Sequence, residues 1–156
     1  MKINKTTNLS LDKFIELSLY DKNSGYYIKR NPFGKKGDFI TAPNISRLFS
    51  EILSIWTITF WESIGSPKKF NLLELGAGNG EMMKVLIETL KNFPNFFNSC
   101  NFIILEKSES LIAQQKKNIN YNKISWIKNL KKTNSLPTIF LANEFFDAIP
   151  IKQFFK

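Results

Sequence analysis

Apolar residues follow the period of an α-helix along the first part of the chain. The first such segment begins after Ser10, a residue type that caps helices, and ends at the turn residues 23–25. A short extended piece is expected at 26–28. A second helix is predicted over 47–63, before Gly65. Few sides of this second helix are polar, so we expect it to be buried.

After residue 67 the pattern changes, because short apolar runs alternate with helical segments. Strands are predicted at 70–75, 102–105, 124–127 and 138–142, helices at 81–92 and 109–118, and a loop at 94–99. Strands that alternate with helices form a parallel sheet. We therefore expect an α/β fold in two parts, a helical region at 1–66 and a Rossmann-like domain at 67–156.

The first predicted strand leads directly into a glycine-rich turn. Glu74 stands near the end of the strand, and Gly76, Gly78 and Gly80 alternate with other residues before a helix begins. Dinucleotide-binding loops favour the spacing G-x-G-x-x-G, which is absent here. The spacing E-x-G-x-G-x-G looks like the form found in S-adenosylmethionine (SAM) methyltransferases, whose ligand carries an ammonium and a sulfonium. The alternative is a glycine-rich turn with no ligand.

A second acidic residue, Glu106, ends the second predicted strand. In nucleotide-binding sheets an acidic residue at this place accepts hydrogen bonds from ribose hydroxyls. A carboxylate suits that role because it offers two acceptor oxygens. The alternative is a surface glutamate beside Lys107.

The segment after the fourth predicted strand contains Asn143, Glu144 and Asp147 with two phenylalanines. α/β sheets bind ligands at the carboxyl ends of their strands. The segment lacks the proline pair that nucleic-acid base methyltransferases often carry there. Two carboxylates beside aromatic rings suit a planar cation such as guanidinium. Alternatively, Asp147 caps a helix and the phenylalanines fill the core.

Composition narrows the possible chemistry. The 156 residues contain no histidine, which excludes Ser-His-Asp and Cys-His catalysis and histidine-based zinc sites, and we expect no metal. Cys100 is the single cysteine, which fits a reducing compartment. No apolar run reaches the roughly 20 residues of a membrane helix, and residues 1–10 carry no targeting pattern. We expect a cytoplasmic protein without membrane insertion.

The formal net charge of +9 raises the question of nucleic-acid binding. The lysines are dispersed, and arginine, the better reader of phosphates and bases, occurs only as Arg30 and Arg47. The charge therefore favours a solvated lysine surface and no nucleic-acid partner. An acidic partner surface and an oligomer both remain open.

Several motifs together resemble the N-terminal part of the MidA family of SAM-dependent methyltransferases. They lie at 25–27, 37–43, 73–80, 106–114 and 143–150 and involve nearly the whole chain. The resemblance implies a class I methyltransferase fold with SAM as cofactor. It implies that residues 1–66 include a segment covering cofactor and substrate. The implied cofactor-binding residues are Asp38, Thr41, Glu74, Gly76, Gly78, Gly80, Glu106 and Asn143.

The same resemblance implies a substrate. The family includes a mitochondrial complex I assembly factor that symmetrically dimethylates an arginine of a complex I subunit. We therefore expect a protein-arginine methyltransferase with Glu144 and Asp147 as catalytic residues. Family members are longer, so the fold is expected to be incomplete, with the fourth strand as an unprotected edge. Two alternatives remain, a non-catalytic assembly module that keeps the fold and a nicotinamide-dependent oxidoreductase, against which the glycine spacing counts.

Overall fold

The computed structural model describes residues 8–29 and 37–154 of the chain. These residues form two compact units. The first unit combines described residues from both ends, 8–29 and 144–154, and the second contains residues 37–143. The proposed division of the chain at residues 66 and 67 stays a prediction.

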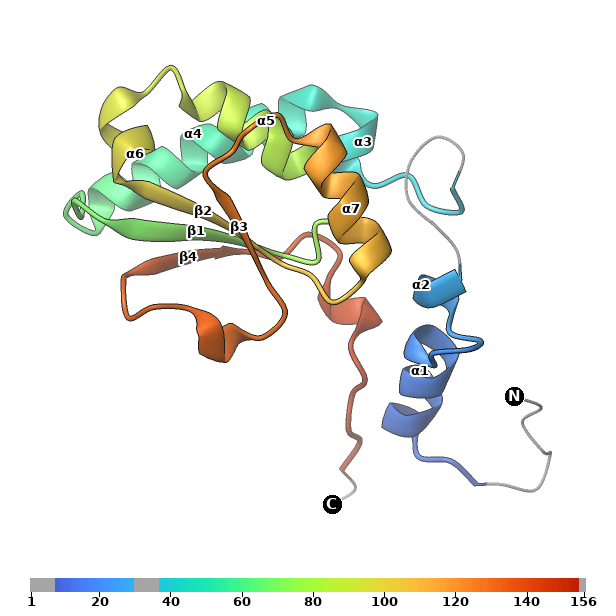
Figure 1. Cartoon of the computed structure of the whole chain (residues 1–156). Coiled ribbons are helices and arrows are strands. Elements are labelled where there is room, and N and C mark those ends of the chain that lie inside the picture. Colours follow the sequence, from blue (N-terminus) through green and yellow to red (C-terminus); the bar gives the residue numbers. More distant parts are fainter. Residues whose placement is uncertain (1–7, 30–36, 155–156) are drawn as a thin grey trace. The chain divides into compact units, whose positions relative to one another are not determined.

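A parallel sheet forms the centre of the second unit (Figure 1). Its strands are β1 (Phe70–Leu75), β2 (Cys100–Leu105), β3 (Ile124–Ile127) and β4 (Thr138–Leu141), in the order β3-β2-β1-β4. The register pairs Leu75 of β1 with Leu105 of β2, so these two strands end side by side. The predicted α/β fold with four parallel strands is confirmed.

The helices of the second unit gather on one side of this sheet (Figure 1). They are α3 (Ala42–Ile45), α4 (Arg47–Ser63), α5 (Glu81–Leu90), α6 (Pro94–Ser99) and α7 (Glu109–Asn118). The short 3₁₀ helix η1 (Leu130–Lys132), between β3 and β4 in the chain, is not part of this group (Figure 1). Alternate residues of β1, Phe70 and Leu72, face the helices and belong to the buried core. The ring of Phe70 lies 5.0 Å from Phe96 and 6.1 Å from Trp61, so an aromatic cluster joins β1 to α6 and α4.

The first unit contains α1 (Leu11–Tyr20), α2 (Tyr26–Lys29) and the 3₁₀ helix η2 (Phe146–Ala148). The Tyr20 hydroxyl donates a 2.7 Å hydrogen bond to the main-chain oxygen of Ala148. Tyr20 also stacks on Tyr27, with ring centroids 5.8 Å apart. The motif at 25–27 and residues 144–150 of the last motif therefore fold into the same unit.

Three local predictions are wrong. Residues 26–28, expected to be extended, lie in α2, which follows a turn closed by the Asp21 carboxylate on the Asn23 and Ser24 amides. Residues 94–99, expected to be a loop, form α6, because proline is well tolerated in the first turn of a helix. The helix at 47–63 has the predicted bounds, but only one of its faces is buried.

Candidate functional site

The glycine-rich turn has the backbone geometry that glycine alone adopts readily. Gly76, Gly78 and Gly80 have φ angles of +64°, +53° and +83°, which are unfavourable for residues with a side chain. The Gly80 amide donates to the Ala77 oxygen at 2.7 Å, and Gly80 precedes the first turn of α5. A Cβ at Gly80 would lie 3.2 Å from side-chain atoms of α7, so this end of the turn packs tightly against that helix.

Glu74, at the end of β1, is a buried acid with unmet hydrogen-bonding capacity. Its side chain is 3% exposed, and among the described residues its Oε2 atom has no hydrogen-bond partner. Burial raises the pKa of Glu74 to about 8; the Met83 amide acts in the opposite direction, and the Glu106 charge adds to the rise. A buried polar atom without a partner is costly, so a donor or cation beside Oε2 would be favourable.

Glu106 follows β2, and its carboxylate accepts hydrogen bonds from nearby amide groups. Its Oε1 accepts hydrogen bonds from the Lys107 and Ser108 amides at 2.8 and 3.0 Å. Its Oε2 accepts a longer bond of 3.3 Å from the Gln115 amide. Burial raises the pKa of Glu106, and these hydrogen bonds partly oppose the rise. A carboxylate offers about four acceptor positions, so about one remains here for a ligand hydroxyl.

Gln115, for which no role was expected from the sequence, connects the glycine turn with Glu106. It lies in α7 with no solvent exposure, and its Nε2 donates to the Gly78 oxygen at 2.9 Å as well as to Glu106. Its Oε1 accepts from the Trp126 indole at 2.9 Å. A signal was available, because Gln115 stands midway between the core residues Leu111 and Ile119 at helical spacing.

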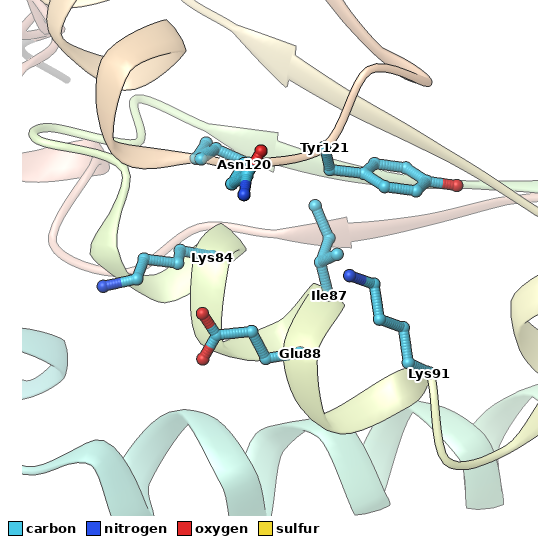
Figure 2. Close-up of a pocket in the computed structure, with 7 residues that line it drawn as sticks. Lys84, Ile87, Glu88, Lys91, Asn120 and Tyr121 are labelled. Carbon is cyan, nitrogen blue, oxygen red and sulfur yellow. The ribbon is translucent and has the colours of Figure 1, made fainter.

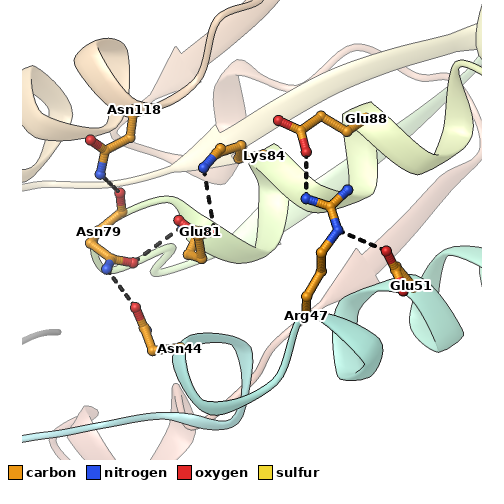
Figure 3. Close-up of polar contacts among 8 residues, drawn as sticks. All are labelled: Asn44, Arg47, Glu51, Asn79, Glu81, Lys84, Glu88 and Asn118. Carbon is orange, nitrogen blue, oxygen red and sulfur yellow. Dashed lines mark hydrogen bonds and ion pairs between the residues drawn. The ribbon is translucent and has the colours of Figure 1, made fainter. Parts of the chain in front are cut away.

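A series of amide hydrogen bonds ties the turn to α3 and α7 (Figure 3). Asn79, inside the turn, donates to Asn44 at 2.7 Å, and Asn44 donates to the Thr41 hydroxyl at 2.9 Å. On the other side, Asn118 donates to the Asn79 main-chain oxygen at 2.8 Å. Thr41, a predicted cofactor residue, is therefore connected to the glycine turn through two asparagines.

An ion-pair network fixes the start of α4 beside this site (Figure 3). Arg47 contacts Glu51 at 2.7 Å within α4 and Glu88 of α5 at 2.8 Å. All three side chains are partly exposed, so the stabilisation is modest. The network orients α4 against α5 and carries no evident chemistry.

The other predicted site residues lie in less regular structure. Asp38 is exposed in the segment before α3, and Asn143 is half-buried directly after β4. Both belong to the second unit, like the glycine turn, whereas Glu144 and Asp147 belong to the first. Glu144 has a φ of +48°, which is unusual for a residue with a side chain.

Asp147 is the middle residue of η2, and the cap position of that helix is Phe145. The expectation that Asp147 caps a helix is therefore not met by its position. Its charge contributes to a raised pKa of Tyr27, after the larger effect of burial. Asp147 is thus close enough to Tyr27, in the motif at 25–27, for its charge to affect the pKa of that tyrosine.

A small cavity lies apart from the turn, between α5 and the segment after α7 (Figure 2). Its volume is about 120 Å³, and its lining includes Lys84, Lys91 and Tyr121. Pockets for ligands of cofactor size span roughly 300–1,000 Å³. The cavity is too small for SAM, and we assign it no role. Among the described residues there is no cluster of potential metal ligands, and none of the helices is long and apolar enough to cross a bilayer.

Comparison with known proteins gives consistent matches. Residues 52–156 match the family described as "Putative S-adenosyl-L-methionine-dependent methyltransferase". The protein arginine methyltransferase NDUFAF7, mitochondrial, of Xenopus tropicalis is 29% identical over 99% of this chain and 42% of its own length. The human protein of that name is 29% identical over 99% of this chain and 41% of its own length. The chain thus spans about two fifths of these relatives.

Solved structures support the same fold. A COG1565 superfamily protein of Burkholderia thailandensis, bound to S-adenosyl-homocysteine, superimposes with a TM-score of 0.73. The two proteins are 24% identical, and the match covers 91% of this chain and 38% of the other. A native structure of a COG1565 protein from the same organism gives a TM-score of 0.70 at 24% identity, covering 92% of this chain and 36% of the other.

One expectation is corrected by these comparisons. The eukaryotic relatives are named mitochondrial, which contradicts the expected cytoplasmic location. The expectation rested partly on Cys100, but a single free thiol cannot distinguish one reducing compartment from another. The match over residues 52–156 covers most of the chain and agrees with the fold and with the glycine turn. The chain belongs to the MidA-like family of S-adenosyl-L-methionine-dependent methyltransferases.

Proposed function

We propose that this chain provides the SAM-binding part of a protein-arginine methyltransferase. The observation that carries the proposal is the pairing of three left-handed glycines with the unpartnered, buried Oε2 of Glu74. The glycines leave the backbone open to a ligand, and a positively charged ligand beside Glu74 would favour the ionised form of that buried acid, whose oxygens then act as acceptors. The family and its cofactor agree with this chemistry.

Each residue has a distinct role in this proposal. Glu74 favours a cationic ligand, and Gly76, Gly78 and Gly80 allow close approach of its methionine and ribose parts. Glu106 accepts a ribose hydroxyl through Oε2, the oxygen with remaining capacity. Thr41 is held near the turn by the asparagine series, while Asp38 and Asn143 are proposed as further cofactor contacts. When bound, SAM supplies an activated methyl group, and the protein supplies alignment.

For the substrate we propose the guanidinium of an arginine in a protein. Two carboxylates, Glu144 and Asp147, follow the last described strand and could hold a guanidinium through paired hydrogen bonds. Relatives covering the chain's full extent are named protein arginine methyltransferases, which supports this substrate class. Symmetric dimethylation of a complex I subunit during complex I assembly is the specific form that we propose. The activity is proposed for the whole protein of the family's length.

Calorimetry tests the cofactor assignment directly. The chain is titrated with SAM, S-adenosylhomocysteine and NAD, and we expect binding of the first two only. Gly78→Val should abolish it, because a branched side chain would occupy the ligand's space and strain the backbone. Gly65→Val is the matched control, since Gly65 also has a positive φ, +88°, but lies outside the turn with open space around it. Equal affinity in wild type and Gly78→Val would disprove the assignment.

The arginine assignment needs a separate experiment. A protein of the family's full length that contains this chain is incubated with methyl-tritiated SAM and candidate protein substrates. Labelled arginine, identified after hydrolysis as symmetric dimethylarginine, is the expected product. Label confined to lysine or to a small molecule would disprove the substrate class and leave the cofactor assignment intact.

A further inference from the structure

Helix α4 buries several small polar side chains and exposes several large apolar ones, which is the reverse of an ordinary surface helix. Its fully buried side chains include Ser50, Ser54 and Thr57, small polar residues that allow close packing on the fold. Six large apolar residues of α4 and its C-cap instead face outward and are 41–60% exposed, whereas Trp61 is buried and Leu53 and Ile58 pack against the core. We define the outer stripe as Leu48, Ile52, Ile55, Trp56, Phe60 and Ile64. Surface helices normally bury such residues.

The polar residues among the outer stripe do not make it hydrophilic. Thr59 and Ser63 lie between its members, but their hydroxyls donate to main-chain oxygens of their own helix, at 3.2 and 2.7 Å. No lysine or arginine stands between Arg47 and the end of α4, although the chain as a whole is strongly basic. The outer stripe therefore contains no charged residue in a protein with a net charge of +9; the acids of the helix are Glu51 and Glu62, which are not members of the stripe.

The size of this face matches a protein interface. Six large side chains that are about half exposed leave on the order of 600 Å² accessible, and the adjoining Ile45 and Phe49 bring the total to about 800 Å². One partner contributes about 800 Å² to a standard stable interface, whereas the largest apolar patch of a monomer is roughly 300–600 Å². Trp56 and Phe60 stack at 5.4 Å near the middle, as aromatic anchors of interfaces do.

We propose that the outer stripe of α4 is a homodimer interface, in which α4 packs antiparallel on α4 of a second copy of this chain. A twofold axis near residues 55 and 56 would place Ile52 of one copy against Thr59 of the other, and Ile55 against Trp56. In a twofold dimer the same patch of each copy packs against itself, so the patch must be self-complementary. The outer stripe extends to either side of the proposed axis and can therefore pack against its own copy.

Sedimentation over a wide concentration range tests this proposal on this chain and on a protein of the family's full length that contains it, because the chain spans about two fifths of its relatives' length. A dimer of the short chain with a monomeric full-length protein would overturn the proposal, since other parts of the protein would then cover the stripe. We expect a monomer–dimer equilibrium that tightens as salt is raised, because salt screens the repulsion between two copies of charge +9. Trp56→Glu should weaken dimerisation by at least about 30-fold, since it removes a central aromatic and buries a charge. Circular dichroism of the variant checks that the fold is kept.

The control addresses the competing explanation, association through the sheet edge. Among the described strands β4 is at an edge, and its Phe140 is 52% exposed, like Trp56. Phe140→Glu should leave the dimer intact. A monomer at all concentrations, aggregates without a defined dimer, or loss of the dimer in Phe140→Glu as well as in Trp56→Glu would overturn the assignment to α4. Loss in Phe140→Glu alone would assign association to β4.

Discussion

Gln115 donates a 2.9 Å hydrogen bond to the main-chain oxygen of Gly78, so a buried side chain of α7 holds the glycine turn in place. The same amide nitrogen also donates a hydrogen bond to Glu106, the residue that follows β2. The turn and the acidic residue, predicted separately from sequence, thus share one supporting side chain. Support of this kind keeps binding groups in a fixed geometry before a ligand arrives.

Gln115→Met should loosen this arrangement. The substitution keeps the approximate size of the side chain but leaves the Gly78 oxygen and the Trp126 indole without their partner. Each buried polar group left without a partner lowers the free energy of unfolding by about 1–3 kcal/mol. Urea denaturation should show the loss of stability, and calorimetry should show weaker SAM binding. Lys117→Met, at an exposed position of the same helix, is the control and should change neither. Unchanged stability in Gln115→Met would contradict the structural role of Gln115.

Glu74 should make stability depend on pH. Its pKa of about 8 in the folded protein lies above the usual value of 4.5, so the folded state binds a proton that the unfolded state has lost. The stabilisation is complete below pH 4.5 and declines as pH rises toward 8, by up to about 1.4 kcal/mol per pH unit. Glu74→Gln removes this contribution. Denaturation from pH 5 to 8.5 should give a flatter stability profile for the variant, and parallel profiles would refute the shift.

Glu106→Gln should weaken SAM binding by about 1–3 kcal/mol, the range for a hydrogen bond to a charged group. The amide keeps the shape of the side chain but loses the negative charge and one acceptor oxygen. Titration calorimetry measures the change. If the affinity stays within error of wild type, Glu106 serves only the local amides of Lys107 and Ser108.

Glu144→Gln and Asp147→Asn should separate turnover from cofactor binding. Both carboxylates are proposed to contact the guanidinium, so turnover on a protein arginine should fall at least about tenfold while SAM affinity stays constant. The measurements need a protein of the family's full length. If both variants keep normal turnover, the carboxylates have no catalytic role.

The sequence predicted the parallel sheet better than the details of the site. Mostly apolar strands, helical spacing and the glycine turn are local signals, so β1, β3, α4 and α7 have the predicted bounds. Gln115 and the asparagines at 44, 79 and 118 escaped prediction, because their roles depend on contacts between distant segments. The exposed face of α4 was also missed, since an apolar helix pattern does not reveal which side meets the fold.

The hydrogen bond from Tyr20 to Ala148 has a consequence for the timing of folding. It joins residues 128 positions apart, so the first unit is assembled from both ends of the chain. During synthesis at roughly 5–20 residues per second, α1 would emerge on the order of ten seconds before its partner segment. The central sheet can form in that interval, whereas Tyr20 at the end of α1 has no Ala148 oxygen to bond until the later segment emerges. The hydrogen bond that closes the first unit can therefore form only after the segment around Ala148 has been made.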